Sequence, residues 1–237
     1  MRALVDAVLS VLLAPSCAAC HEPLAHPTRG CVCEACWAQV SPLPAPLCQR
    51  CGEPLPRTSS LLVCQTCLRA RPLVTQARAA GPYSGTLRTI VHALKYDGRR
   101  SLARPLAARM RVAGADLCRG CELVVPVPLH SARRRSRGFN QAHDLACHLG
   151  LPVVQALQRT RDTHTQTTLP AEARHANVAH AFAVARRMDA LRGTTVLLVD
   201  DVRTTGATLE ACAEALLGAG VREVRALTAA RVETPGG

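Results

Sequence analysis

Eight cysteines near the start of the chain have the spacing of metal ligands. They form two copies of the pattern C-x2-C-x12-C-x2-C, and the second copy begins 31 residues after the first. A C-x2-C pair supplies two thiolates from one turn, and two pairs complete the tetrahedral shell of a structural zinc ion. We therefore predict tandem zinc ribbons that hold two Zn²⁺ ions. The predicted ligands are Cys17, Cys20, Cys33 and Cys36 for one ion, and Cys48, Cys51, Cys64 and Cys67 for the other.

The remaining cysteines have weaker patterns. An interleaved pairing of the four C-x2-C pairs would satisfy the same chemistry, and Cys31 is a spare or alternative ligand. Cys118 and Cys121 form an isolated C-x-x-C pair, which is more typical of incidental thiols than of a redox or metal site. Cys147 and Cys212 fall in helical patterns and are predicted to be core residues. The concentration of C-x-x-C pairs favours a reducing compartment over a disulfide framework.

A second candidate site lies in residues 196–208, with the sequence VLLVDDVRTTGAT. The apolar run predicts a buried strand that delivers Asp200 and Asp201 to the carboxyl edge of a parallel sheet, where ligands bind. The following loop leads into a helix N-terminus, and its backbone amides, hydroxyls and helix dipole suit a phosphate. The two carboxylates can accept hydrogen bonds from sugar hydroxyls, so the segment predicts a ribose 5-phosphate site. The predicted binding residues are Asp200, Asp201, Arg203, Thr204, Thr205, Gly206, Ala207 and Thr208. The alternative is an acidic strand end before an N-capped helix, as in receiver domains.

The basic charge of the chain is unevenly distributed. The formal net charge is +12, and residues 78–137 contain thirteen basic residues but only three acidic ones. This distribution favours polyanionic partners, either nucleic acid or phosphorylated small molecules, although a solvated arginine-rich surface is the simpler alternative. Lys95 is the only lysine, beside 28 arginines. Its segment predicts a mobile loop over a phosphate site, where a compact ammonium would serve; the alternative is the chance survival of one lysine in a chain that prefers arginine.

Strands alternate with helices in the C-terminal two thirds of the chain. Residues 123–127, 195–199 and 221–229 are predicted strands, and residues 140–149 and 207–217 are predicted helices. This order indicates an α/β fold with a parallel sheet. We expect a zinc module with an N-terminal helix in residues 1–70 and the α/β domain in residues 77–237. Residues 3–14 are too short for a membrane span, so we expect a protein that is not integral to the membrane. The reducing compartment indicated by the cysteine pairs predicts a cytoplasmic location, and a secretory signal is the weaker alternative.

Several stretches together resemble one family. Residues 196–208 resemble the phosphoribosyl pyrophosphate (PRPP) loop of type I phosphoribosyltransferases. The whole chain resembles the ComF family of competence-associated proteins in the stretches 83–88 (YSGTLR), 92–99 (HALKYDGR), 125–130 (VPVPLH) and 133–141 (RRRSRGFNQ). Gln166, Arg174, Asn177, Ala181 and Phe182 continue the match. The resemblance implies a type I phosphoribosyltransferase-like parallel sheet flanked by helices and preceded by a small zinc-ribbon module.

The resemblance also implies roles for individual residues. The backbone of Pro128, Leu129 and His130 would bind the pyrophosphate of PRPP, with Mg²⁺ bridging its oxygens. By the same resemblance, Arg133, Arg135 and Arg137 are candidates for binding pyrophosphate or a phosphodiester chain, and Lys95 joins them as the only lysine of the chain. As catalytic candidates, Asp200 and Asp201 would hold the ribose and favour its positive transition state.

Three functions fit these residues. The first is a phosphoribosyltransferase of nucleobase salvage, although no residue identifies itself as the base for an acceptor. The second is a ComF-like protein of DNA uptake that binds a phosphoribosyl ligand, single-stranded DNA or both, and whose zinc module recruits a helicase-like competence partner. The third is a regulator that senses PRPP. Because the zinc module and the basic stretch are not required for PRPP chemistry, the second is preferred. With five aromatic residues, DNA binding would be mainly electrostatic and salt-sensitive.

Overall fold

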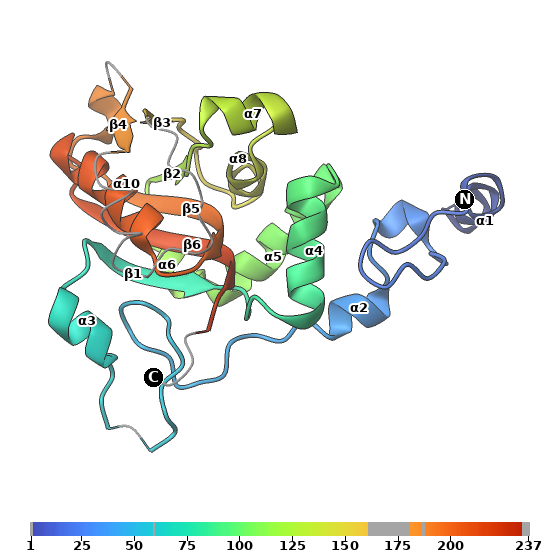
Figure 1. Cartoon of the computed structure of the whole chain (residues 1–237), viewed down its shortest axis with the longest axis horizontal. Coiled ribbons are helices and arrows are strands. Elements are labelled where there is room, and N and C mark those ends of the chain that lie inside the picture. The colour runs from blue at the N-terminus through green and yellow to red at the C-terminus, as the bar shows by residue number, and fades with distance from the viewer. Residues whose placement is uncertain (1, 59, 161–180, 186–187, 234–237) are drawn as a thin grey trace.

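The computed structural model describes residues 2–58, 60–160, 181–185 and 188–233 (Figure 1). The helices are α1 (Arg2–Leu13), α2 (Glu34–Ala38), α3 (Gln65–Ala70), α4 (Gly85–Tyr96), α5 (Ala103–Ala113), α6 (Ala115–Cys118), α7 (Ser131–Arg137), α8 (Gln141–Ala146) and α10 (Ala207–Gly218), with 3-10 turns η1 (Pro27–Arg29), η2 (Arg100–Leu102) and η3 (Asp189–Leu191). The strands are β1 (Val74–Ala79), β2 (Leu123–Pro126), β3 (Leu157–Arg159), β4 (Phe182–Val184), β5 (Thr195–Arg203) and β6 (Glu223–Arg231).

A four-stranded sheet forms the centre of the molecule. Its order is β1-β6-β5-β2, and every neighbouring pair is parallel. The predicted strands at residues 123–127, 195–199 and 221–229 correspond to β2, β5 and β6, and β5 continues to Arg203. Because all four strands are parallel, their carboxyl ends meet at one edge of the sheet. The predicted parallel α/β fold is confirmed.

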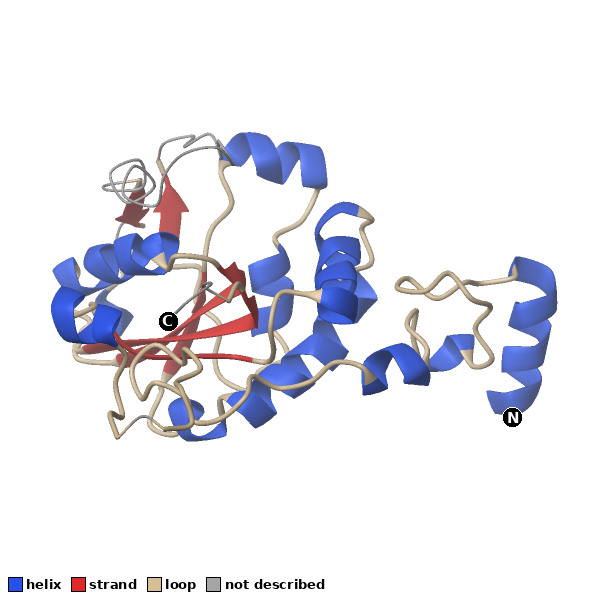
Figure 2. Ribbon diagram, turned by 60° about the horizontal axis from the view of Figure 1, so that its bottom comes forward, coloured by secondary structure: helices blue, strands red, loops and turns tan. Residues whose placement is uncertain are grey.

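Helices cover both faces of the sheet (Figures 1 and 2). Successive residues of β5 point to opposite faces, so Leu197 packs with the α4 and α5 layer while Leu198 packs with α10. Cys212 of α10 is fully buried, as predicted for a core residue. The same prediction is wrong for Cys147, which is exposed because α8 ends at Ala146 and leaves Cys147 at its cap.

The N-terminal part of the chain extends away from the sheet. In Figure 1, α1 lies at the far end of the molecule from β1, and the segment that joins α1 to α2 lies between α1 and the α/β layers. Asp6 of α1 accepts a hydrogen bond from the backbone N–H of Thr28 at 2.9 Å, which fixes the helix to η1. Among the described residues, no helix has the length and apolar character needed to cross a bilayer.

Candidate functional site

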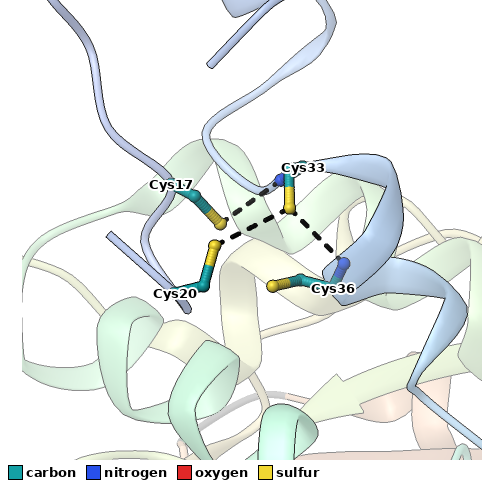
Figure 3. A group of neighbouring side chains, drawn as sticks. All are labelled: Cys17, Cys20, Cys33 and Cys36. Atoms are coloured by element: carbon teal, nitrogen blue, oxygen red, sulfur yellow. Dashed lines mark hydrogen bonds between the residues drawn. The ribbon is translucent and has the colours of Figure 1, made fainter. Parts of the chain in front are cut away.

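The first four predicted zinc ligands converge on one point. The sulfur atoms of Cys17, Cys20, Cys33 and Cys36 all lie within 4.8 Å of one another, and Figure 3 shows their side chains directed inward. Cys20 Sγ lies 3.9 Å from Cys33 Sγ. A tetrahedral ion with Zn–S bonds of about 2.3 Å requires sulfur–sulfur edges of about 3.8 Å. The cluster is therefore compatible with a structural zinc ion.

Backbone amides prepare the first cluster for a cation. The N–H groups of Ala19 and Cys33 donate to Cys17 Sγ at 3.4 and 3.3 Å. Burial alone would raise the pKa of Cys17, but N–H donors from Cys20, Cys33 and Ala19 outweigh it and lower the pKa to about 6. The thiolate, which is the form that binds zinc, is thus favoured near neutral pH.

The second cluster repeats the first. Cys48, Cys51, Cys64 and Cys67 also bring their sulfurs within 4.8 Å of one another, and Cys51 Sγ lies 3.6 Å from Cys64 Sγ. The N–H of Cys64 donates to Cys48 Sγ at 3.3 Å, as Cys33 does to Cys17. The ligands group as two consecutive sets of four and are not interleaved. Cys31 belongs to neither set, and its sulfur lies 3.5 Å from Ser101 Oγ.

One position of the repeat differs because the second ribbon packs on the sheet. His21 and Gly52 occupy equivalent positions and have nearly the same left-handed backbone, with φ of 65° and 68°. A Cβ atom on Gly52 would lie 2.6 Å from the carbonyl oxygen of Ala77 in β1. The backbone N–H of Ala77 also donates to the Arg50 carbonyl at 2.6 Å. Glycine is required here because the two backbones approach closely.

Two arginines connect the second ribbon to the carboxyl edge of the sheet. Arg203 Nη1 and Arg231 Nη1 donate to the carbonyl oxygen of Cys51 at 2.7 and 2.8 Å. Arg231 also forms an ion pair with Glu53. The Arg203 guanidinium lies directly beside Gly206, where a Cβ atom would be 3.1 Å from Nε. Arg203, a predicted ligand-binding residue, therefore joins a zinc ligand to the loop after β5.

The loop after β5 has the geometry of an anion site. Gly206 takes a left-handed conformation with φ of 89° and caps the twelve-residue helix α10. Thr204 and Thr205 are exposed, and Thr205 Oγ1 accepts from the Ala207 amide at 3.4 Å. The first amides of a helix have no carbonyl one turn earlier to bond, so they attract anions together with the helix dipole. Thr208 is half-buried in the first turn.

The two adjacent carboxylates at the end of β5 differ in their surroundings. Asp201 is buried, and its oxygens contact Lys95 Nζ at 2.8 Å and Gln141 Nε2 at 2.5 Å. Asp200 is half-buried and lies within β5, before the loop. Burial and the negative charge of Asp201 raise the pKa of Asp200 to about 7, despite the opposing charge of Lys95. A carboxyl group with this pKa can exchange a proton near neutral pH.

Further predicted residues lie at the same edge. Lys95 occupies the last turn of α4, where the sequence predicted a mobile loop. Pro128, Leu129 and His130 form the connection between β2 and α7, and Arg133 is half-buried in α7. Arg135 is exposed on α7, as is its neighbour Arg134.

Sequence reasoning named Arg137 but missed its partners, and it missed the pair formed by Arg100 and Asp144. Arg137 Nη1 donates to Gln141 Oε1 at 2.6 Å, and its guanidinium lies 5.1 Å from the centre of the Tyr96 ring. Arg100 forms two hydrogen bonds to Asp144, at 2.6 and 2.8 Å. Gln141 and Tyr96 lie in stretches that resemble the ComF family, and this resemblance was the only signal for them in the sequence. It did not indicate which residues they contact. Gln166, Arg174 and Asn177 lie outside the described residues.

Comparisons with known proteins match both parts of the chain. A family model described as a double zinc ribbon domain matches residues 8–68, and one described as a phosphoribosyl transferase domain matches residues 135–235. Competence protein F of Haemophilus influenzae is 31% identical over 69% of this chain and 76% of its own length. DNA utilization protein YhgH of Salmonella typhimurium is 37% identical over 60% of this chain and 66% of its own length. An orotate phosphoribosyltransferase structure from Aeropyrum pernix covers 61% of this chain and 76% of its own, with a TM-score of 0.34 and 21% identity.

Proposed function

The chain belongs to the ComF family of competence proteins, and from that premise we propose that it binds a PRPP-type phosphoribosyl ligand and acts in DNA uptake during natural competence. The relatives named for competence and DNA utilization support the cellular role. The match to a phosphoribosyl transferase domain supports the ligand class. Bound zinc requires reduced cysteines, so we also propose a cytoplasmic location.

The loop between β5 and α10 is the observation that carries the ligand proposal. A left-handed Gly206, two exposed threonines and the start of a twelve-residue helix form a cradle for a phosphate monoester. Asp200 precedes this loop on β5, and its carboxylate can accept hydrogen bonds from ribose hydroxyls. Mg²⁺ would accompany the ligand and neutralise its pyrophosphate. Pro128, Leu129 and His130 follow the neighbouring strand β2, within the same edge.

The DNA contact is proposed for the exposed basic side chains of α7. Arg134 and Arg135 are exposed, and the chain as a whole carries a net charge of +12. Arginine side chains of this kind bind phosphates without reading the sequence, so affinity should fall steeply with salt. The zinc module, proposed as residues 1–70, would recruit the helicase-like partner. Its helix α1 exposes Leu4, Val11 and Leu12, which supports an interaction there.

Calorimetric titration of PRPP with Mg²⁺ tests the ligand proposal. Wild type should bind, while Thr205→Ala and Asp200→Asn should each weaken binding about tenfold or more. Thr205→Ala removes a hydroxyl that donates to the phosphate, and Asp200→Asn removes a charged acceptor for the ribose hydroxyls. Thr89→Ala, on the exposed side of α4, is the matched control and should bind as wild type does. No binding by wild type would refute the proposal.

Two further assays separate DNA binding from transfer chemistry. Filter binding of single-stranded DNA over a salt series should give a steep loss of affinity, and Arg134→Ala with Arg135→Ala should reduce the slope by about two. Pyrophosphate release from PRPP should be measured with and without each common nucleobase. Release that depends on an added base would instead support a transferase of nucleobase salvage.

A further inference from the structure

Lys95 of α4 and Asp201 of β5 form an ion pair at the carboxyl edge of the sheet. Lys95 Nζ lies 2.8 Å from Asp201 Oδ1, and the two side chains are 16% and 6% exposed. The other carboxylate oxygen accepts a hydrogen bond from Gln141 Nε2 at 2.5 Å. Both oxygens of Asp201 are therefore engaged by side chains of the protein. A ribose hydroxyl that bound Asp201 would have to compete with a charged partner and an amide.

Gln141 is itself fixed in one orientation. Its side chain is buried, and its amide oxygen accepts from Arg137 Nη1 at 2.6 Å. The amide nitrogen must then face the carboxylate of Asp201. Arg137 in turn lies over the ring of Tyr96, 5.1 Å from the ring centre. Residues from α4, α7, α8 and β5 thus form one chain of contacts that ends on Lys95.

This chain of contacts holds a positive charge at the carboxyl edge of the sheet, next to Asp201. Burial acts to lower the pKa of Lys95, but Asp201, Asp200 and Tyr83 outweigh it and raise the pKa, so the ammonium stays charged. An ammonium has three donors, and the contact with Asp201 uses one of them. Lys95 is also the only lysine in a chain with 28 arginines. A compact point charge binds an anion without the planar fork that an arginine would impose.

We propose that Asp201 is a positioning residue that holds Lys95, and that Lys95 binds the anionic group on the anomeric end of the phosphoribosyl ligand. Asp200 is then the carboxylate that binds the sugar hydroxyls. This assignment rests on the proposed function and narrows it, because it makes the site selective for a pyrophosphate-bearing sugar over ribose 5-phosphate. The two adjacent aspartates consequently have different roles.

The test compares two ligands that differ only at the anomeric carbon. PRPP and ribose 5-phosphate, each in the presence of Mg²⁺, are titrated into wild type, Asp201→Asn, Lys95→Met and the double variant. Asp201→Asn and Lys95→Met should each weaken PRPP binding about tenfold or more, with ribose 5-phosphate affinity changed by less than about twofold. The double variant should lose no more than Lys95→Met alone, since Asp201 acts through Lys95. Equal weakening of both ligands by Asp201→Asn, or additive losses, would overturn the proposal.

Asp200→Asn is the matched comparison, because it alters the neighbouring carboxylate by the same isosteric change. It should weaken both ligands, as expected for a residue that contacts the ribose. If Asp200→Asn weakened only PRPP, the division of roles between the two aspartates would be wrong.

The single lysine provides a second readout that needs no ligand. Protein labelled with ¹⁵N-lysine contains one lysine side-chain ammonium, and its titration reports the pKa of Lys95 directly. Asp201→Asn should lower this pKa, while Asp189→Asn, at a fully exposed position on η3, should leave it unchanged. An unchanged Lys95 pKa in Asp201→Asn would refute the positioning role. If wild type bound neither ligand, the proposed function would fail, and this titration would still decide whether Asp201 holds Lys95.

Discussion

Replacing Gly52 by alanine tests whether the second zinc ribbon is seated on the sheet. The new Cβ would lie 2.6 Å from the Ala77 carbonyl oxygen, which belongs to a strand paired with β6 and cannot rotate away. Alanine in a left-handed conformation costs about 1–2 kcal/mol. Overpacking against fixed backbone adds about 1–3 kcal/mol. The total expected loss of unfolding free energy is therefore about 2–5 kcal/mol.

Gly98→Ala is the matched control for this prediction. Gly98 has nearly the same backbone, with φ of 63° against 68° for Gly52, but a Cβ there meets nothing within 4 Å. It should carry only the conformational cost. For a chain of this size, 1 kcal/mol corresponds to about 2–4 °C in Tm. Thermal unfolding of the zinc-loaded proteins by circular dichroism should therefore place Gly52→Ala about 2–12 °C below Gly98→Ala.

Gly52→Ala should also disturb the loop after β5. Displacing Gly52 moves the adjacent Cys51 carbonyl, which accepts hydrogen bonds from Arg203 and Arg231. PRPP affinity should therefore drop in Gly52→Ala and remain at the wild-type value in Gly98→Ala. Equal Tm values for the two variants would refute the reasoning, because the ribbon would then not be held against β1.

Three other predictions concern zinc, pH and the first ribbon. Wild type should contain two zinc ions, and a chelator should remove the first ion faster than the second. The reason is that Cys20 is exposed, whereas no cysteine of the second cluster is. A single release phase would contradict this prediction. The pKa of Asp200 is raised to about 7 in the folded chain, so the unfolded chain loses the carboxyl proton of Asp200 at lower pH than the folded chain does. The free energy of unfolding should therefore fall as pH rises from about 4 to 7. Denaturant unfolding of Asp200→Asn over that range should lack this part of the fall, and an identical pH profile would contradict the assignment. Arg109→Met removes a guanidinium that lies 4.8 Å from the Trp37 ring and donates to the Trp37 carbonyl at 2.8 Å. This variant should lower the free energy of unfolding by about 1 kcal/mol and change the fluorescence of Trp37, the only tryptophan. An unchanged emission spectrum would show that the first ribbon does not pack on Arg109.

Local patterns in the sequence determined the zinc clusters and the loop after β5. The repeat of C-x2-C pairs specified the eight ligands, because each pair lies on one turn. The grouping into two consecutive sets of four, instead of an interleaved arrangement, came from the tertiary structure. The apolar run before Asp200 and the helical spacing after Gly206 likewise specified a strand, a loop and a helix that are consecutive in the chain. Periodicity and turn chemistry encode such features because they involve neighbouring residues.

Only the tertiary structure decided which distant side chains meet. Arg203 bonds the carbonyl of Cys51, 152 residues away, and Gln141 bonds Asp201 across 60 residues. Lys95 contacts Asp201 because α4 ends at the carboxyl edge of β5, and no pattern around Lys95 specifies that edge. These contacts depend on the strand order β1-β6-β5-β2 and on the packing of helices over it. Strand order arises from the packing of the whole core, so a local sequence signal does not carry it.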